Sequence, residues 1–238
     1  QGNLDLAKSH IIEAQETGIN LIVFSEMFLT GYPPEDLLLR EDFLEESERC
    51  SKELEGLSKE ISIIIGCPSR VEKNIFNSAL FYQNGKIVKN YKKQILPNYK
   101  EFDEKRYFLK GEAHEVFEDG GLRFGISICE DIWNETVIDC LSETGAEIII
   151  SINASPYTTK KIDQRMSVAV SRVFESKLPL IYLNRVGGQD ELVFDGSSFC
   201  LSDSGELTVQ LSDFKEEILN IDLYKNNNKW NFQKNIKN

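Results

Sequence analysis

The sequence contains few residues that could hold a metal ion or build a disulfide framework. It has only two histidines, His10 and His114, and its five cysteines are an odd number, widely spaced, with no CxxC pair. The cysteines are Cys50, Cys67, Cys129, Cys140 and Cys200. Zinc sites use clustered cysteine and histidine ligands, and disulfide-stabilised domains use paired cysteines. We therefore predict no metal site, free thiols and a cytoplasmic location.

Long apolar runs and positive charge are also scarce. No run reaches the roughly 18 apolar residues that a membrane-spanning helix needs. Lysine and arginine total 27 against 39 aspartates and glutamates, which gives a formal net charge of -12. Such a charge repels the phosphates of nucleic acids. We therefore predict neither a membrane partner nor a nucleic-acid partner.

The composition is otherwise that of a globular chain. Of the 238 residues, 41% are apolar and 28% are charged, and this length suits one domain or at most two. There is no internal repeat and no linker composition, so we predict one domain over residues 1–222. The segment NNNKWNFQKNIKN shows no periodicity, and residues 223–238 are expected to be a polar, frayed tail or the start of a connection. The alternative for Trp230 in this segment is a docking residue.

Helical and strand-like segments alternate along the chain. Helical spacing covers residues 1–18, 42–60, 133–145 and 162–177. Strand patterns cover residues 20–26, 61–66, 77–83, 86–91, 122–129, 147–153, 179–185, 197–202 and 216–223, and residues 93–121 read as irregular. Asn84-Gly85 predicts a hairpin, because a type I′ turn needs positive φ at both central residues. The alternation indicates a layered α/β fold.

Two reactive side chains stand at the ends of predicted buried strands. Glu26 follows the apolar run LIVFS directly, where a buried carboxylate could act as a general base. Cys129 ends the strand LRFGISIC beside the start of a helix, where backbone N–H groups favour a thiolate and can hold an oxyanion. The alternatives are a solvated glutamate and a small buried apolar cysteine. Lys93, taken alone, reads as a solvated surface charge.

Neither histidine is placed to activate a cysteine. His10 lies in the first helical segment and His114 in a polar loop, so a Cys-His pair of the protease type is not expected. A carboxylate base and a lysine can replace the histidine. A thiol activated by a glutamate, with an ammonium that stabilises the tetrahedral oxyanion, suffices for attack on an amide or nitrile carbon.

Four strings carry a resemblance to a known family. FSEMFLTGYPPEDLL, KKQILPNYKEFDEKRYF, ICEDIW and INASPY occur in this order between about residues 2 and 222. They resemble the signatures of the nitrilase, or carbon–nitrogen hydrolase, superfamily, and specifically the glutaminase domain of glutamine-dependent NAD+ synthetases. LPNY followed by FDE and RYF is typical of this branch. The resemblance implies an α/β fold, the four-layer αββα sandwich of the nitrilase type, and the family's first strand is missing here. We therefore expect either a fragment of a longer synthetase or a chain that works with a separate partner.

The resemblance also assigns residue roles. It makes Glu26 the general base, Lys93 the cation that stabilises the oxyanion and Cys129 the nucleophile. Lys92 is the rival of Lys93, which is preferred because the family's lysine stands two residues after the tyrosine, here Tyr91. By the same resemblance, the residues that hold glutamine are Tyr32, Tyr99, Glu130, Ser155 and Lys161. Lys161 departs from the family pattern, which more often has Gly-Lys or Gly-Arg where this chain has Lys160-Lys161.

The implied activity is the release of ammonia from L-glutamine through a thioester on the cysteine, to supply ATP-dependent amidation of deamido-NAD to NAD+. No Ser-Gly-Gly-x-Asp-Ser pyrophosphatase loop occurs in the sequence. ATP and Mg²⁺ are therefore expected only in a synthetase domain or partner chain, with no cofactor in this one. The superfamily also implies a homo-oligomer. The alternatives are a free-standing amidase for another small amide and a catalytically silent assembly module.

Overall fold

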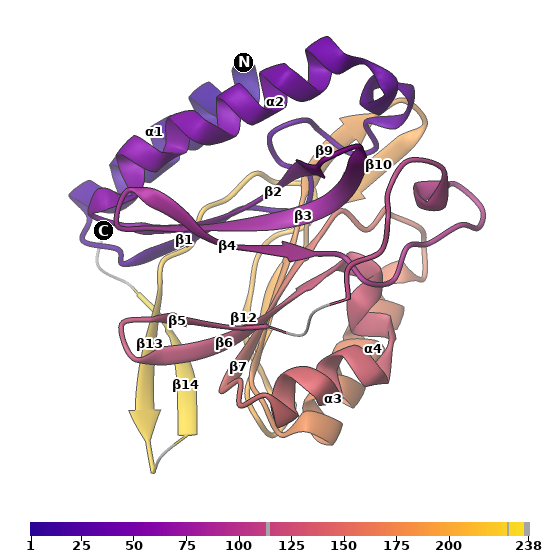
Figure 1. Ribbon diagram of the computed structural model, residues 1–238. Coiled ribbons are helices and arrows are strands. Elements are labelled where there is room, and N and C mark those ends of the chain that lie inside the picture. The colour runs from indigo at the N-terminus through magenta and orange to yellow at the C-terminus, as the bar shows by residue number, and fades with distance from the viewer. Residues whose placement is uncertain (113–114, 228, 236–238) are drawn as a thin grey trace. The chain divides into compact units, whose positions relative to one another are not determined.

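The computed structural model describes residues 1–112, 115–227 and 229–235. The chain divides into two compact units, Gln1–Ala113 and His114–Asn238. Each unit contains one large sheet and two α-helices (Figure 1). The predicted loop position of His114 lies outside the described residues. Among the helices of the described residues, none is long and apolar enough to cross a membrane.

The first unit is built on a four-stranded sheet with the order β1-β2-β3-β4. β1 is parallel to β2, and the other pairs are antiparallel. The elements are α1 (Gly2–Glu16), β1 (Leu21–Val23), the 3-10 helix η1 (Glu35–Leu39), α2 (Glu41–Glu53), η2 (Leu54–Lys59), β2 (Ser62–Val71), β3 (Asn74–Gln83), β4 (Lys86–Lys92) and η3 (Glu104–Arg106). Asn84 and Gly85 join β3 to β4 with φ values of 54° and 78°, which confirms the predicted hairpin.

Helices α1 and α2 lie on one face of this sheet (Figure 1). Apolar residues recur in α1 at helical spacing, so that Leu4, Ala7 and Ile11 are all buried on one side. They belong to the same apolar cluster as Ile63 and Ile65 of β2. Because side chains alternate along a strand, the residues between them face the opposite side of the sheet. That opposite side is where the candidate site of this unit is built.

The second unit is built on a six-stranded sheet with the order β12-β11-β8-β7-β6-β5. The three strands β6, β7 and β8 are parallel neighbours. The elements are β5 (Val116–Asp119), β6 (Leu122–Ile128), η4 (Cys129–Trp133), α3 (Glu135–Glu143), β7 (Ile148–Asn153), α4 (Lys161–Ser176), β8 (Leu180–Asn184), β9 (Val186–Gln189), β10 (Leu192–Asp195), β11 (Phe199–Leu201), β12 (Leu207–Gln210), β13 (Ile221–Asn226) and β14 (Lys229–Lys234).

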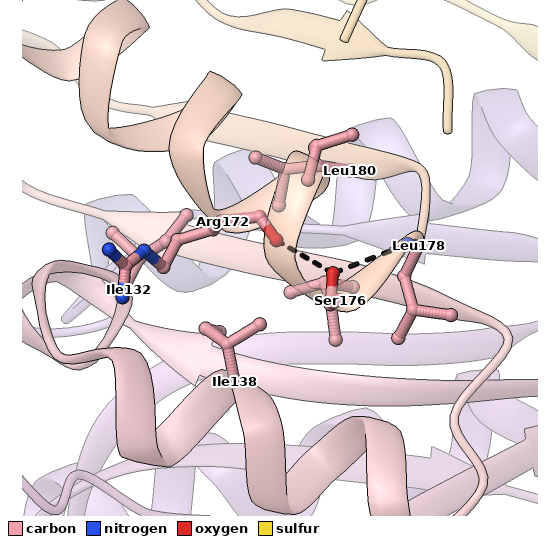
Figure 2. Close-up of a pocket in the computed structure, with 8 residues that line it drawn as sticks. Ile132, Ile138, Arg172, Ser176, Leu178 and Leu180 are labelled. Carbon is pink, nitrogen blue, oxygen red and sulfur yellow. Dashed lines mark hydrogen bonds between the residues drawn. The ribbon is translucent and has the colours of Figure 1, made fainter. Parts of the chain in front are cut away.

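The two helices of the second unit, α3 and α4, pack against each other. Ile138 of α3 and Val173 of α4 are both buried. Figure 2 shows the end of α4, where the Ser176 hydroxyl donates to the carbonyl of Arg172 at 2.7 Å and accepts from the N–H of Leu178 at 3.2 Å. These bonds satisfy backbone groups at the helix end, so the chain can leave α4 and enter β8 directly.

The C-terminal segment differs from the sequence prediction. Residues 223–238 were expected to form a frayed polar tail, but β13 and β14 pair as an antiparallel hairpin within the described residues. Phe232 of β14 is buried and packs with Cys200 and Val209. Trp230 and Phe232 alternate with polar residues, which is the strand period that the analysis overlooked. The expectation of a frayed tail was therefore wrong for residues 223–227 and 229–235.

Four shorter strands were also not predicted, namely β5, β9, β10 and β12, of which β5 and β9 are the clearest cases. β5 lies in the stretch 93–121 that reads as irregular, and it pairs with β6 after a turn at Gly120 and Gly121, whose φ values are 54° and 82°. β9 contains two glycines in the run VGGQ, which suggests a loop, but it pairs antiparallel with β10. Each of these two strands pairs with the next strand along the chain, and this pairing outweighs the weak β-strand propensity of its own residues.

Candidate active site

Glu26 and Lys93 form a fully buried ion pair in the first unit. Lys93 Nζ lies 2.8 Å from Glu26 Oε1, and both side chains are 0% exposed. The two residues are 67 positions apart in the sequence. A buried charge is tolerated only when it is paired and hydrogen-bonded. The alternative interpretation of Glu26 as a solvated carboxylate is therefore wrong.

Glycines bring the backbone of each partner into position. A Cβ atom on Gly66 of β2 would lie 2.7 Å from the Cα of Glu26, a distance that Cβ atoms do not adopt. A Cβ atom on Gly111 would lie 2.8 Å from the carbonyl carbon of Lys92, and the N–H of Gly111 donates to the carbonyl of Lys93 at 2.7 Å. The chain therefore needs glycine at both crossings to bury the ion pair.

The lysine that contacts Glu26 is Lys93 and not its neighbour. Lys92 Nζ lies 4.2 Å from the centroid of the Phe76 ring, a cation–π contact on a half-buried side chain. Adjacent strand residues face opposite sides of a sheet, so only one of the two lysines can reach the glutamate. Lys93 is thus the lysine beside Glu26, and its catalytic role stays a prediction.

Glu104 is a second carboxylate in this cluster, and no role was predicted for it. Its Oε1 atom accepts hydrogen bonds from Lys93 Nζ at 2.8 Å and from the Tyr32 hydroxyl at 2.9 Å. The side-chain amide of Asn77 donates to Glu26 Oε1 at 2.7 Å and to Glu104 Oε1 at 3.3 Å. One ammonium and one amide therefore connect two carboxylates. The FDE string was the available signal, but no buried strand leads into it.

Burial sets the titration of Glu104. It raises the pKa of this carboxyl to about 7, while Lys93 lowers it and Glu26 raises it further. Its other oxygen, Oε2, is buried and has no hydrogen-bond partner among the residues that the structure describes. An oxygen in that situation suits the protonated form of the carboxyl. The cluster therefore holds one group that changes its charge near neutral pH.

Cys129 lies at the carboxyl end of β6 in an unusual backbone conformation. Its φ is 49°, a value that few non-glycine residues adopt and that persists only where the surroundings hold it. Asp131 Oδ2 accepts the N–H of Ile128 at 3.0 Å, which fixes the turn. Cys129 is 4% exposed. A five-residue 3-10 helix follows it, and the longer helix α3 begins only at Glu135.

Burial disfavours ionisation of three other cysteines. Burial raises the pKa of the Cys67 and Cys200 thiols to about 12. Burial, followed by the charge of Glu46, also raises the pKa of Cys50. The thiolate is the nucleophilic form of cysteine. These three residues therefore behave as apolar packing residues.

Three of the predicted glutamine-holding residues lie in the second unit with Cys129. Ser155 is buried and follows the end of β7, the strand beside β6. The carboxyl ends of parallel strands meet at one edge of a sheet, so Ser155 and Cys129 share that edge. Glu130 adjoins Cys129 and is half-buried. Lys161 begins α4, and its Nζ lies 4.5 Å from the centroid of the Trp133 ring.

The remaining two predicted residues lie in the first unit. Tyr32 is buried, and its hydroxyl joins the Glu26–Lys93 cluster through Glu104. Tyr99 is 46% exposed and packs edge-on against Phe102 with ring centroids 5.6 Å apart. The glutamine-holding roles of all five residues stay predictions. Within the described residues, no group of three or more His, Cys, Asp or Glu side chains could hold a metal ion.

A family model described as carbon-nitrogen hydrolase matches residues 1–227. The chain belongs to the carbon–nitrogen hydrolase family. It is 39% identical over 222 residues to a glutamine-dependent NAD(+) synthetase of Acinetobacter baylyi, which covers 91% of this chain and 41% of the relative. A glutamine-dependent NAD(+) synthetase of Aquifex aeolicus is 39% identical over 226 residues, covering 94% of this chain and 40% of the relative. The chain thus spans about two fifths of the length of these relatives.

Solved structures confirm the fold. A glutamine-dependent NAD+ synthetase from Acinetobacter baumannii in complex with ADP matches 91% of this carbon–nitrogen hydrolase chain and 41% of its own, with a TM-score of 0.84 and 35% identity. An amidase of the nitrilase superfamily from Nesterenkonia matches 89% of this chain and 80% of its own, with a TM-score of 0.80 and 23% identity. The predicted α/β fold of the nitrilase type is therefore confirmed.

Proposed function

We propose that this carbon–nitrogen hydrolase is a glutaminase, which hydrolyses the side-chain amide of L-glutamine to glutamate and ammonia. The buried ion pair of Glu26 and Lys93 carries the chemical part of the proposal. Away from water, a fixed carboxylate and a fixed ammonium can serve as base and as oxyanion stabiliser. The names of the relatives, glutamine-dependent NAD(+) synthetases, support glutamine as the substrate.

In the proposed mechanism, Glu26 accepts the proton of the Cys129 thiol as the sulfur attacks the carboxamide carbon of glutamine. Lys93 and the backbone N–H that follows Cys129 stabilise the oxyanion. The oxyanion then collapses, the carbon–nitrogen bond breaks, and Glu26 returns the proton to the leaving nitrogen, which departs as ammonia. Water gives a proton to Glu26 and attacks the thioester. The thiol leaves with that proton, and glutamate is released.

Glu104 keeps Lys93 between two carboxylates. Lys93 Nζ lies 2.8 Å from an oxygen of each. Glu104 therefore gives Lys93 a second hydrogen-bond acceptor, which fixes the ammonium group at the position from which it contacts Glu26.

The ammonia of this reaction would supply the ATP-dependent amidation of deamido-NAD to NAD+. That second step, with its ATP and Mg²⁺, belongs in this proposal to a synthetase domain or partner chain. The relatives support such a partner, because they are longer than the region that matches this chain. The proposal also includes a homo-oligomer located in the cytoplasm.

Covalent labelling tests the proposal on the intact chain. A diazoketone analogue of glutamine should add one adduct per chain, mapped to Cys129 by peptide mass, and an excess of glutamine should block it. Cys129→Ala should abolish the adduct, whereas Cys140→Ala, at a half-buried cysteine on α3, should leave it unchanged. Labelling that other small amides block, but glutamine does not, would indicate a different amidase. A folded chain that is not labelled would contradict the catalytic proposal altogether.

A further inference from the structure

Arg165 of α4 is buried, and all three of its guanidinium nitrogens donate hydrogen bonds. It is 2% exposed. Nη1 donates to the two carboxylate oxygens of Asp195 at 2.7 and 2.9 Å, and Nη2 donates to the carbonyls of Ser155 and Pro156 at 2.7 and 3.0 Å. Nε donates to the hydroxyl of Ser155 at 3.1 Å. Arg165 lies in the predicted helical segment 162–177, and its sequence context indicates no role for it.

Asn184 holds the same segment from the end of β8. Its Oδ1 accepts the N–H of Ser155 at 2.9 Å, and its Nδ2 donates to the carbonyls of Ser155 at 3.3 Å and Gly196 at 3.1 Å. The N–H, the carbonyl and the hydroxyl of Ser155 are therefore all bonded to side chains of other elements. A residue fixed in this way loses little conformational freedom when a ligand binds to it.

The hydroxyl of Ser155 still has a proton to donate. A hydroxyl group has one donor and two acceptor positions. One acceptor position is occupied by Arg165, and no hydrogen bond found among the described residues uses the proton. The proton must point away from the guanidinium, since the guanidinium N–H points at the oxygen. Ser155 is 2% exposed and lies at the sheet edge that carries Cys129. A buried donor at this edge suits a ligand atom that accepts a hydrogen bond.

We propose that Arg165 is a positioning residue of the substrate site, which fixes the Ser155 hydroxyl so that its proton is donated to the α-carboxylate of glutamine. The inference rests on the proposed glutaminase function. The carboxamide oxygen is the other acceptor on glutamine, but the mechanism assigns it to Lys93 and a backbone N–H. Asp195 neutralises Arg165, so the contact with the carboxylate comes from the hydroxyl proton of Ser155 and not from the charge of Arg165.

The test measures how well three ligands protect Cys129 of the intact chain from the diazoketone analogue. L-glutamine carries both α groups, glutaramate lacks the α-amino group, and γ-aminobutyramide lacks the α-carboxylate. The variants are Ser155→Ala, the paired change Arg165→Met with Asp195→Leu, and all three substitutions together. The paired change removes both charges, because Arg165→Met alone would leave Asp195 buried without a partner.

In Ser155→Ala, the concentration of glutamine or glutaramate that half-protects Cys129 from labelling should rise about tenfold or more, as expected for loss of a hydrogen bond to a charged group. Protection by γ-aminobutyramide should change by less than about twofold. The paired variant should show the same pattern. Because Arg165 acts through Ser155, the protection constants of the triple variant should lie within about twofold of those of Ser155→Ala.

Controls separate positioning from a general structural effect. Arg172→Met, at an arginine of the same helix that pairs with Glu175, should leave all three protection constants unchanged. The alkylation rate of Cys129 by iodoacetamide and the near-UV circular dichroism report an intact site and fold in every variant. Should the paired variant fail to fold, Arg165→Lys retains the charge without the planar fork and should show the same ligand pattern.

Three outcomes would overturn the inference. In the first, the losses of protection in Ser155→Ala and in the paired variant add in full in the triple variant. In the second, Ser155→Ala also weakens protection by γ-aminobutyramide. In the third, Ser155→Ala does not weaken protection by glutaramate. If glutamine does not protect the unsubstituted chain, the proposed function fails and the inference fails with it. If glutamine protects the unsubstituted chain but the losses add, only the inference fails.

Discussion

Two glutamates share one lysine in the first unit, and burial determines when the second carboxylate ionises. The pKa of Glu104 is raised by burial from 4.5 to about 7. Native Glu104 therefore keeps its proton over a pH range in which the unfolded chain has already lost it. Linkage fixes the sign: the stability that protonated Glu104 contributes is complete below a pH of about 4.5 and is lost as the pH rises through about 7.

Glu104→Gln removes this titration and keeps an oxygen that can accept hydrogen bonds from Lys93 and Tyr32. We expect the free energy of unfolding of the variant, relative to the unsubstituted chain, to increase as the pH rises from about 5 to about 8. Urea denaturation across this range measures the difference. Glu101→Gln, at an exposed glutamate in the same stretch, is the matched control. A constant difference for Glu104→Gln would contradict the raised pKa.

The close approach of Gly66 to Glu26 gives a second prediction for single residues. In Gly66→Ala the new Cβ would lie 2.7 Å from the Cα of Glu26, so the backbone must move. We expect a loss of about 1–3 kcal/mol in unfolding free energy, as for other overpacked sites, and slower labelling of Cys129 by the diazoketone analogue. Gly56→Ala meets no atom within 4 Å and serves as the control. Normal stability and labelling in Gly66→Ala would show that Glu26 does not depend on this glycine.

Residues at strand ends could be predicted from the sequence, whereas their partners could not. Glu26 stands out because LIVFS leads directly into it. Lys93 reads locally as a solvated lysine, and only the family resemblance selected it, because its burial depends on a glutamate 67 residues away and on the crossing of Gly111. Glu104 and Arg165 come from an irregular stretch and from a helix, so no local pattern distinguishes them.

Elements with a strong local signal were predicted closely. Helix α1 and the hairpin at Asn84-Gly85 follow from apolar spacing and from turn chemistry. The hairpin of β13 and β14 was not predicted, because its strands are rich in lysine and asparagine and expose most of their side chains. What holds it is the burial of Phe232 against β11 and β12, and a contact with strands so distant along the chain is invisible in a local window.

Phe232 should therefore control the folding of the C-terminal hairpin. Replacing a buried phenylalanine with alanine costs about 3–5 kcal/mol, and an isolated two-stranded hairpin is marginally stable at best. In Phe232→Ala we expect amide protons of β13 to exchange rapidly while those of β7 stay protected, as measured by hydrogen exchange with mass spectrometry. Tyr224→Ala, at a residue that is 44% exposed, should leave both strands protected. Unchanged protection of β13 in Phe232→Ala would assign the hairpin's stability to other contacts.

The division of the whole molecule into two compact units was not apparent in the sequence. The boundary between residues 113 and 114 falls within the stretch 93–121, which has no linker composition. One family model spans both units. The proposed chemistry takes Glu26 and Lys93 from the first unit and Cys129 from the second, so it requires both units in one folded chain. Tests of that chemistry therefore belong to the intact chain.

Ligand-induced stabilisation of the intact chain distinguishes the hydrolase step from the synthetase step. A ligand present at a hundred times its Kd stabilises the native state by about 2.7 kcal/mol, and about 1 kcal/mol shifts the Tm of a chain of this size by about 2–4 °C. In Cys129→Ala, which by the proposed mechanism cannot turn glutamine over, glutamine should raise the Tm by several degrees.

MgATP should leave the Tm unchanged, because the sequence has no Ser-Gly-Gly-x-Asp-Ser loop and its net charge of -12 disfavours binding of a polyphosphate. Glutaramate and γ-aminobutyramide serve as matched ligands that each lack one α group of glutamine. A shift with MgATP but none with glutamine would place the nucleotide step in this chain and remove the substrate from the hydrolase proposal. A shift with glutamine alone would leave the amidation of deamido-NAD to a partner that receives the ammonia.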